Sequence, residues 1–337
     1  MAFAKRGLDA IRDDFVVLEW VSWEFAETLR DGAKREIPKI ANVEKFRSWL
    51  APLIKRRLVE EPEVAKYIKL PPVYQETIEV GWDDQHLGLY LTVADDFAQW
   101  YRQSKDDRKN NLAVLLAKLQ AVQKALNCPQ DSKGNFSAYT SLTLKQEAVL
   151  DKLEEIALVG EKSILFAENP ATVKLLHREL KKRKIASIPF HGGITIKKRV
   201  AEKNEFFRHG DVPHLLATKA TAKSGYNEPQ ADYVIFYDQS WSHRIMDQAM
   251  HRPLRPERVK PLKVLHYIIE GSLDTYQAQM VAFKRDSANA GLDWATPELD
   301  GEEFLHLGTI LERFVDDLAL INGCDARTMR EKLKKAA

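Results

Sequence analysis

Two arginines set three residues apart, Arg252 and Arg255, are the strongest candidates for chemistry, with Gln248 one helical turn before Arg252. The apolar run 233–237 and the acid Asp238 precede this segment, which predicts a buried strand, a short loop and then a helix. Two guanidiniums on one helix face can hold the oxygens of a transferring phosphoryl group. A solvated basic helix surface is the alternative for this spacing taken alone.

The elements that would position these residues alternate along residues 160–285. Apolar runs predict strands at 163–167, 185–190, 212–218, 232–237 and 262–269, and helical periodicity is present at 171–183, 195–208, 243–251 and 273–285. Strands separated by amphipathic helices indicate right-handed crossovers and a mainly parallel sheet. Ligands on such sheets bind at the carboxyl ends of the strands. The loops after Phe190, Thr218 and Asp238 are expected at that edge.

The remaining segments have a more helical pattern. Apolar residues recur at helical spacing in 8–30, 43–59, 86–101 and 111–126, with one alternating stretch, 73–80, typical of a strand. The tryptophans of this part are interpreted as core residues. Residues 127–143 have the composition of a linker, and 301–334 look helical. We expect a helical protrusion region (1–130), an α/β lobe (131–290) and a small helical appendage (291–337).

Composition limits the class of protein. The chain has 337 residues, 45% hydrophobic and 30% charged, as in soluble globular proteins of two domains. No apolar run reaches the roughly 20 residues of a membrane helix, and the first residues of the sequence lack the apolar core of a secretory signal. Cys128 and Cys324 have no partners at metal-ligand spacing, so we expect no metal site of the chain's own and an intracellular protein of the cytoplasm, nucleoid or nucleus.

The net charge of +2 hides a segregation of charge along the chain. Residues 174–203 hold ten Lys/Arg against two acids, whereas residues 293–317 hold eight acids against one arginine. A basic segment of this kind is typical of a surface that binds a polyanion. An ordinary solvated helix face is the alternative reading of the same charges.

Six segments in order resemble the C-terminal half of a Swi/Snf-type ATPase of the superfamily 2 helicases, over about residues 45–285. They are Ser163–Glu168; His191-Gly192-Gly193 with Arg199 and Phe206; Leu215–Thr218 with Gly225-Tyr226-Asn227; Ala231–Asp238; Gln248-Ala249 with Arg252 and Arg255; and Gly271–Asp274. Upstream, Leu50–Arg57, Leu70-Pro71-Pro72 and Asn127-Cys128-Pro129 resemble the helical protrusion of that family. The chain departs from the pattern at Thr221-Ala222, where the family has two glycines.

The resemblance implies an α/β, RecA-like second lobe that works with ATP and Mg²⁺. Arg252 and Arg255 would stabilise charge on the γ-phosphoryl group, and Gln248 would orient their helix or the attacking water. The residues implied to approach the nucleotide are Gly225, Asn227 and Asp238. A plain turn glycine and a helix-capping acid are the alternatives for Gly225 and Asp238.

The resemblance also implies contacts with the backbone of double-stranded DNA. The residues implied are His191, Gly192, Thr218, Lys219 and Lys223. Backbone N–H groups, hydroxyls and ammoniums of this kind contact phosphates without reading bases.

The sequence contains no G-x-x-x-x-G-K-[ST] loop to hold phosphates. In the family this loop belongs to a first RecA-like lobe, which we expect from another polypeptide or a missing segment. The chain is therefore interpreted as one half of an ATP-dependent DNA translocase, inactive alone. The alternative is a non-catalytic DNA-binding or adaptor protein that retains the helicase lobe.

Overall fold

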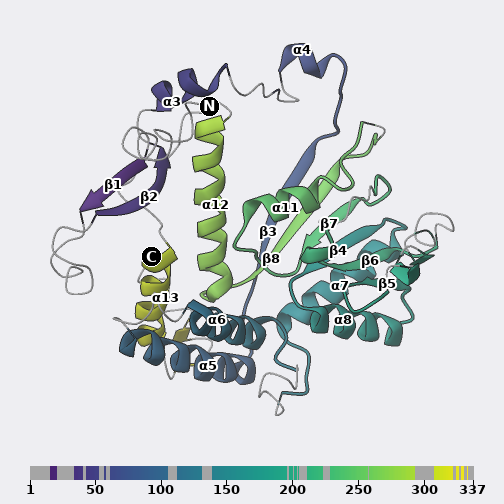
Figure 1. Cartoon of the computed structure of the whole chain (residues 1–337). Helices are drawn as coiled ribbons and strands as arrows, with labels where there is room; N and C mark the ends of the chain where they lie inside the picture. Colours follow the sequence, from purple (N-terminus) through teal and green to yellow (C-terminus); the bar gives the residue numbers. More distant parts are fainter. Residues whose placement is uncertain are drawn as a thin grey trace.

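The computed structural model describes residues 16–20, 34–40, 43–52, 57, 61–104, 112–130, 139–195, 197–199, 201–202, 204, 211–222, 228–256, 258–292, 307–321, 324–325, 328–329 and 332. Figure 1 shows a sheet with helices on both of its faces and a group of helices at one end of it. In that view β1 (Val16–Trp20) and β2 (Lys34–Ile40), an antiparallel pair, lie apart from the larger sheet.

The larger sheet has six strands in the order β3-β8-β7-β4-β6-β5. Every pairing in it is parallel, so the carboxyl ends of all six strands lie at one edge. The strands are β3 (Val73–Val80), β4 (Ser163–Ala167), β5 (Ser187–Phe190), β6 (His214–Thr218), β7 (Tyr233–Phe236) and β8 (Leu262–Ile269). The predicted α/β, RecA-like parallel sheet is confirmed.

Two hydrophobic cores cover the two faces of this sheet. Alternate residues of each strand point to opposite faces, so β4 sends Leu165 to one core and Phe166 to the other. Helices α7 (Leu144–Leu158) and α8 (Pro170–Lys182) cover the first face. Helices α11 (His243–Met250) and α12 (Leu273–Leu292) contribute to the core on the second face.

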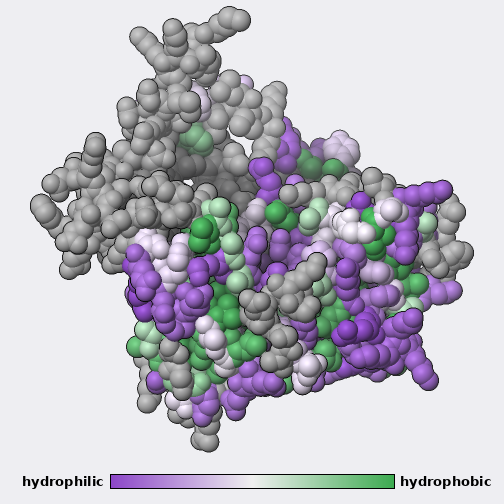
Figure 2. Space-filling view, turned by 60° about the horizontal axis from the view of Figure 1, so that its bottom comes forward, coloured by the Kyte–Doolittle hydropathy of each residue, from purple (hydrophilic) through white to green (hydrophobic). Residues whose placement is uncertain are grey.

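Helices α7 and α8 begin at residues that cap them. Thr143 and Gln146 form a reciprocal capping box at the start of α7, and Asn169 accepts a hydrogen bond from Ala171 N at the start of α8. Most of the exposed basic residues of 174–203 belong to α8 and the segment after β5. The surface over α7 and α8 is mainly hydrophilic (Figure 2).

A third core joins the helical layer, which consists of α5 (Asp84–Gln103), α6 (Leu112–Asn127), α13 (Leu307–Ile321) and one end of α12. Figure 1 shows α5, α6 and α13 together at the bottom of the molecule. Tyr90 of α5 accepts a backbone hydrogen bond from Leu273, and Arg102 donates to the carbonyl of Val315. Segments far apart in the sequence therefore form one helical unit beside the sheet.

Two expectations from the pattern of residues need correction. Val16–Trp20 is a strand, although 8–30 has helical spacing, because β-branched and aromatic side chains favour extended structure. Strand β3 lies in the sheet of the lobe, although its residues fall in the range expected for the helical protrusion. The short helices α3 (Val43–Leu50), α4 (Pro62–Ala65) and α10 (Lys219–Ala222) complete the described elements.

Candidate functional site

The carboxyl edge of the sheet carries the loops that the sequence singled out. His191 directly follows β5, Thr218 ends β6 and Asp238 comes two residues after β7. The loop after β4, which begins at Glu168, lies between them because β4 separates β6 from β7. The structure therefore brings these three predicted residues to one edge.

His191 is buried at this edge. Its Nδ1 accepts a hydrogen bond of 3.2 Å from Gly193 N. Burial lowers the pKa of His191, and the nearby charges of Lys174 and Arg199 lower it further. The following Gly192 is exposed, and a Cβ there would meet no atom within 4 Å, whereas a Cβ at Gly193 would lie 3.1 Å from His191 Nδ1. A side chain at 193 would therefore press on the His191 ring, and the backbone of 192 is left open to a ligand.

Thr218 ends β6 and begins a turn whose Thr221 reaches the carboxyl end of β5. The Thr221 hydroxyl lies 2.6 Å from the Thr218 carbonyl and 3.3 Å from that of Phe190, and has one proton to donate between them. Thr218 itself is buried, with its hydroxyl 3.5 Å from that of Thr221. The hydroxyl of Thr218 thus contributes to the shape of the loop.

Lys219 does not lie where a phosphate contact would require. It is 1% exposed, and its Nζ lies 2.5 Å from Asp238 Oδ1 and donates to the Asp238 carbonyl at 2.6 Å. Both carboxylate oxygens of Asp238 accept from Glu168 N, at 3.0 and 2.9 Å. The expected surface role of Lys219 is therefore corrected to a buried ion pair that ties together the ends of β4, β6 and β7. The other three predicted residues of this loop, Lys223, Gly225 and Asn227, lie outside the described residues.

The arginine segment lies at the opposite edge of the sheet. Helix α11 starts beyond the carboxyl end of β7 and runs back along the sheet for 8 residues, which is roughly 12 Å. The carbonyl of Arg252 accepts from Glu228 N, five residues before β7 begins. The phosphoryl-binding candidates are thus separated from His191 and Thr218 by the length of a helix, and they do not face the carboxyl edge.

The side chains of the segment are partly accessible. Gln248 is exposed, and Arg252 and Arg255 are half-buried. Arg255 Nη1 donates to the carbonyls of His251 at 3.0 Å and Leu254 at 3.1 Å. These bonds fold the guanidinium back over its own turn, so Arg255 would have to exchange them for contacts with a bound phosphate.

Arg258 is a buried neighbour of the arginine segment that the sequence pattern did not single out. Its guanidinium donates to the carbonyls of Pro229, Ala231 and Pro261 at 2.6 to 2.8 Å. Asp232 lies 3.4 Å away and offsets part of its charge. Arg258 therefore fastens the segment after α11 to the amino ends of β7 and β8. Its position three residues after Arg255 was the available signal.

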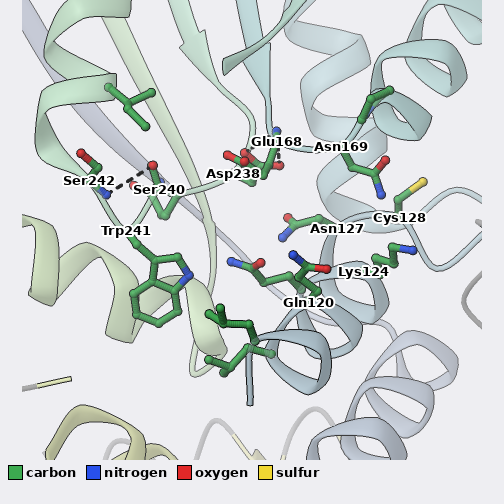
Figure 3. Close-up of a pocket in the computed structure, with 16 residues that line it drawn as sticks. Gln120, Lys124, Asn127, Cys128, Glu168, Asn169, Asp238, Ser240, Trp241 and Ser242 are labelled. Carbon is green, nitrogen blue, oxygen red and sulfur yellow. Dashed lines mark hydrogen bonds between the residues drawn. The ribbon is translucent and has the colours of Figure 1, made fainter. Parts of the chain in front are cut away.

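A pocket of about 560 Å³ opens between α6 and the loops after β4 and β7 (Figure 3). The chain leaves β4 toward β5 on one side and leaves β7 toward β8 on the other, so this is the topological switch point of the sheet, where ligands of α/β folds commonly bind. Asp238 is part of its wall, and the rest was missed because it combines α6 with two distant loops. Its polar lining includes Gln120, Lys124, Asn127, Glu168, Asn169 and Gln239.

Comparison with known proteins agrees with this geometry. Residues 145–257, which run from α7 to the arginine segment, match the helicase conserved C-terminal domain. They form a helicase C-terminal domain. The predicted resemblance to the C-terminal half of a Swi/Snf-type superfamily 2 helicase is thereby confirmed.

Two curated relatives illustrate the similarity. The DNA repair protein RAD5 of Cryptococcus neoformans var. neoformans is 29% identical over 172 residues, 50% of this chain and 14% of the relative. The putative ATP-dependent helicase/translocase YwqA of Bacillus subtilis is 22% identical over 272 residues, 79% of this chain and 29% of the relative. The matched region is thus less than a third of either relative.

Solved structures share the fold. The C-terminal part of the Fun30 ATPase domain superposes with a TM-score of 0.55 at 15% identity and covers 74% of this chain and 97% of that one. The Sulfolobus solfataricus SWI2/SNF2 ATPase core in complex with dsDNA gives 0.54 at 21% identity, covering 74% and 53%.

None of the helices in the described ranges is long and apolar enough to cross a membrane. The same residues include no group of three or more His, Cys, Asp or Glu side chains placed to hold a metal ion.

Proposed function

We propose that this chain is the second lobe of an ATP-dependent translocase of the Swi/Snf type that moves on double-stranded DNA inside the cell. The observation that carries the proposal is the helicase C-terminal domain match over 145–257, which includes both the loops of the carboxyl edge and the arginine segment. The two edges of the sheet would bind different ligands. The amino edge would meet the nucleotide, and the carboxyl edge would meet the DNA.

At the amino edge, Arg252 and Arg255 would act on the γ-phosphoryl group of ATP. Both are half-buried, which fits a surface that another lobe covers during hydrolysis. Two guanidiniums would offset the charge that develops on the transferring phosphoryl oxygens, and Gln248 of α11 would orient the segment that carries them or the attacking water. A first RecA-like lobe would hold the other side of the nucleotide and the Mg²⁺. Gly225 and Asn227 remain proposed contributors to this site, whereas Asp238, at the carboxyl edge, would act only by holding the ends of β4, β6 and β7 together.

At the carboxyl edge, the backbone at Gly192 and the residues around Thr218 and Lys223 would contact phosphates of one DNA strand. His191 would act as a neutral donor, because its Nδ1 already accepts a hydrogen bond. Lys174 and Arg199 lie close enough to His191 to lower its pKa and would add positive charge. Contacts of this type fix the position of the protein without reading the sequence.

The decisive experiment combines this chain with a polypeptide that carries the phosphate-binding first lobe and measures DNA-stimulated ATP hydrolysis. The Arg252→Ala variant is expected to lower kcat by about 10³-fold or more, the range of arginine fingers. The Arg244→Ala variant is a matched control, because Arg244 is an exposed arginine near the start of α11, the helix that ends just before Arg252. Rapid hydrolysis by this chain alone would refute the need for a first lobe.

A second candidate function is a non-catalytic DNA-binding or adaptor protein. The contacts of Arg255 with its own turn favour it, since a guanidinium held by two carbonyls stabilises the turn without any nucleotide. Hydrolysis by the reconstituted pair that is unchanged in Arg252→Ala would support this adaptor role. DNA binding that weakens with salt is expected under both readings.

A further inference from the structure

The pocket between α6 and the loops after β4 and β7 contains an unsatisfied buried donor. Gln239 lines it, is 5% exposed, and its Nε2 has no hydrogen-bond partner among the described residues. A buried amide that lacks a partner destabilises a protein unless something supplies the missing bond. Because Gln239 is part of the pocket wall, a ligand in the pocket is a candidate for the missing partner.

Other amides surround the same space. Asn127 Oδ1 accepts from Lys145 Nζ, which can only donate, so Asn127 Nδ2 is directed away from that ammonium. Gln120, Gln123 and Asn169 add further carboxamides to the lining. Figure 3 shows Gln120, Lys124 and Asn127 on the α6 side of the pocket, with Glu168 and Asp238 above them. Carboxamides present donor and acceptor together and match the edges of nucleobases.

The charges of the lining do not favour an anion. Lys124 is the cation among the lining side chains, and Glu168 and Asp238 contribute two carboxylates. Lys219 neutralises Asp238 from behind, at 2.5 Å. The two ammoniums, Lys124 and Lys219, are matched by the two carboxylates, Glu168 and Asp238, so the pocket offers a phosphate no net positive charge. An uncharged ring would not be repelled by either carboxylate.

Trp241 supplies a flat wall. It is half-buried, packs against the core of the helical layer and lines the pocket opposite α6 (Figure 3). An indole held in place from behind is a suitable surface for stacking a planar ring. The volume of about 560 Å³ lies within the roughly 300–1,000 Å³ of small-molecule sites.

We propose that this pocket binds a nucleobase, stacked on Trp241 and hydrogen-bonded by Gln239 and the amides of α6. The base would belong to a free nucleoside or to an unpaired nucleotide of a DNA strand. The pocket lies at the carboxyl edge, away from the arginine segment, so binding of a free nucleoside does not rest on the proposed function, whereas binding of a DNA base does.

The test uses the full chain and the fluorescent nucleoside 2-aminopurine riboside, whose emission is quenched when it stacks. We expect saturable quenching that adenosine or cytidine reverses and ribose 5-phosphate does not. Gln239→Met is expected to weaken binding about ten-fold or more, because a buried donor is lost. Gln75→Met, an exposed glutamine on β3, is the matched control and should leave the affinity unchanged.

Two further arms keep the test decisive. If Gln239→Met fails to fold by circular dichroism, Gln120→Ala at an exposed position of α6 replaces it, with an expected loss of about three-fold. Quenching of a single unpaired 2-aminopurine in a DNA duplex, but not of the riboside, would assign the base to DNA, and the reverse would assign it to a free nucleoside. Absence of saturable quenching in both, or displacement by ribose 5-phosphate, would overturn the proposal.

Discussion

Replacing Lys145 with methionine is expected to destabilise the whole molecule, because Lys145 is half of a fully buried ion pair. Its Nζ lies 2.6 Å from Asp274 Oδ2 and 2.8 Å from Asn127 Oδ1, and both charged side chains are 0% exposed. The same ammonium lies 5.0 Å from the ring centre of Tyr237. Three elements, α6, α7 and α12, therefore meet at one charge.

The magnitude follows from what the substitution leaves behind. Methionine keeps the length and apolar stem of lysine, so packing changes little and the main loss is the positive charge. Asp274 would then be a buried carboxylate with no counter-charge, which costs about 3–5 kcal/mol. Domains are stable by about 5–15 kcal/mol, so this single change removes a large part of the total. Replacing both partners, Lys145→Met with Asp274→Leu, should recover most of the loss.

The assay is urea unfolding followed by circular dichroism, for the two single variants and the double variant. A coupling free energy of at least about 2 kcal/mol is expected from the cycle. Lys118 and Asp96 form the matched control, because their charges are as close, at 2.7 Å, but Asp96 is 74% exposed. Lys118→Met should change the free energy of unfolding by less than about 1 kcal/mol.

Additive single variants, or a Lys145→Met cost equal to that of Lys118→Met, would refute this reasoning. Either result would mean that water or another cation reaches Asp274, and that burial does not amplify the pair.

Three other predictions follow. Burial lowers the pKa of His86 and of His214 to about 4 in the folded protein, whereas in the unfolded chain each histidine has its ordinary pKa near 6.5. Between pH 4 and pH 6.5 the unfolded chain therefore binds more protons than the folded protein. Stability should therefore be full above pH 6.5 and fall by about 3 kcal/mol per histidine as the pH drops to 4, with a smaller decrease in His86→Gln; a flat urea midpoint over this range would contradict it. Arg258→Met should cost about 2–4 kcal/mol in urea unfolding, because buried carbonyls lose their donor, and a loss below 1 kcal/mol would argue against its fastening role. Gly160→Ala should destabilise by about 1–2 kcal/mol, since its φ is +71°, whereas Gly88→Ala on α5 should stabilise by about 0.5–1 kcal/mol, and thermal melts showing the same sign for both would contradict the argument.

The elements of the lobe could be predicted from the sequence because they depend on local periodicity. Alternation and continuous apolar runs identified the strands from β4 to β8, and right-handed crossovers then put Phe190, Thr218 and Asp238 at one edge. The spacing of Arg252 and Arg255 was also visible in the chain itself. These properties need only neighbouring residues and the chirality of the backbone.

The environment of each charge was decided by tertiary structure. Lys219 and Lys145 look like ordinary surface lysines in the sequence, yet both are buried. Each forms an ion pair with an acid from another element, and Lys145 and Asp274 are 129 residues apart. The edge at which the arginines lie depends on the direction in which α11 returns, and the pocket around Gln239 depends on α6 packing against two loops. Burial and hydrogen bonding between distant segments set these outcomes, because the free energy of a charge depends on the groups that surround it in space rather than on its neighbours in sequence.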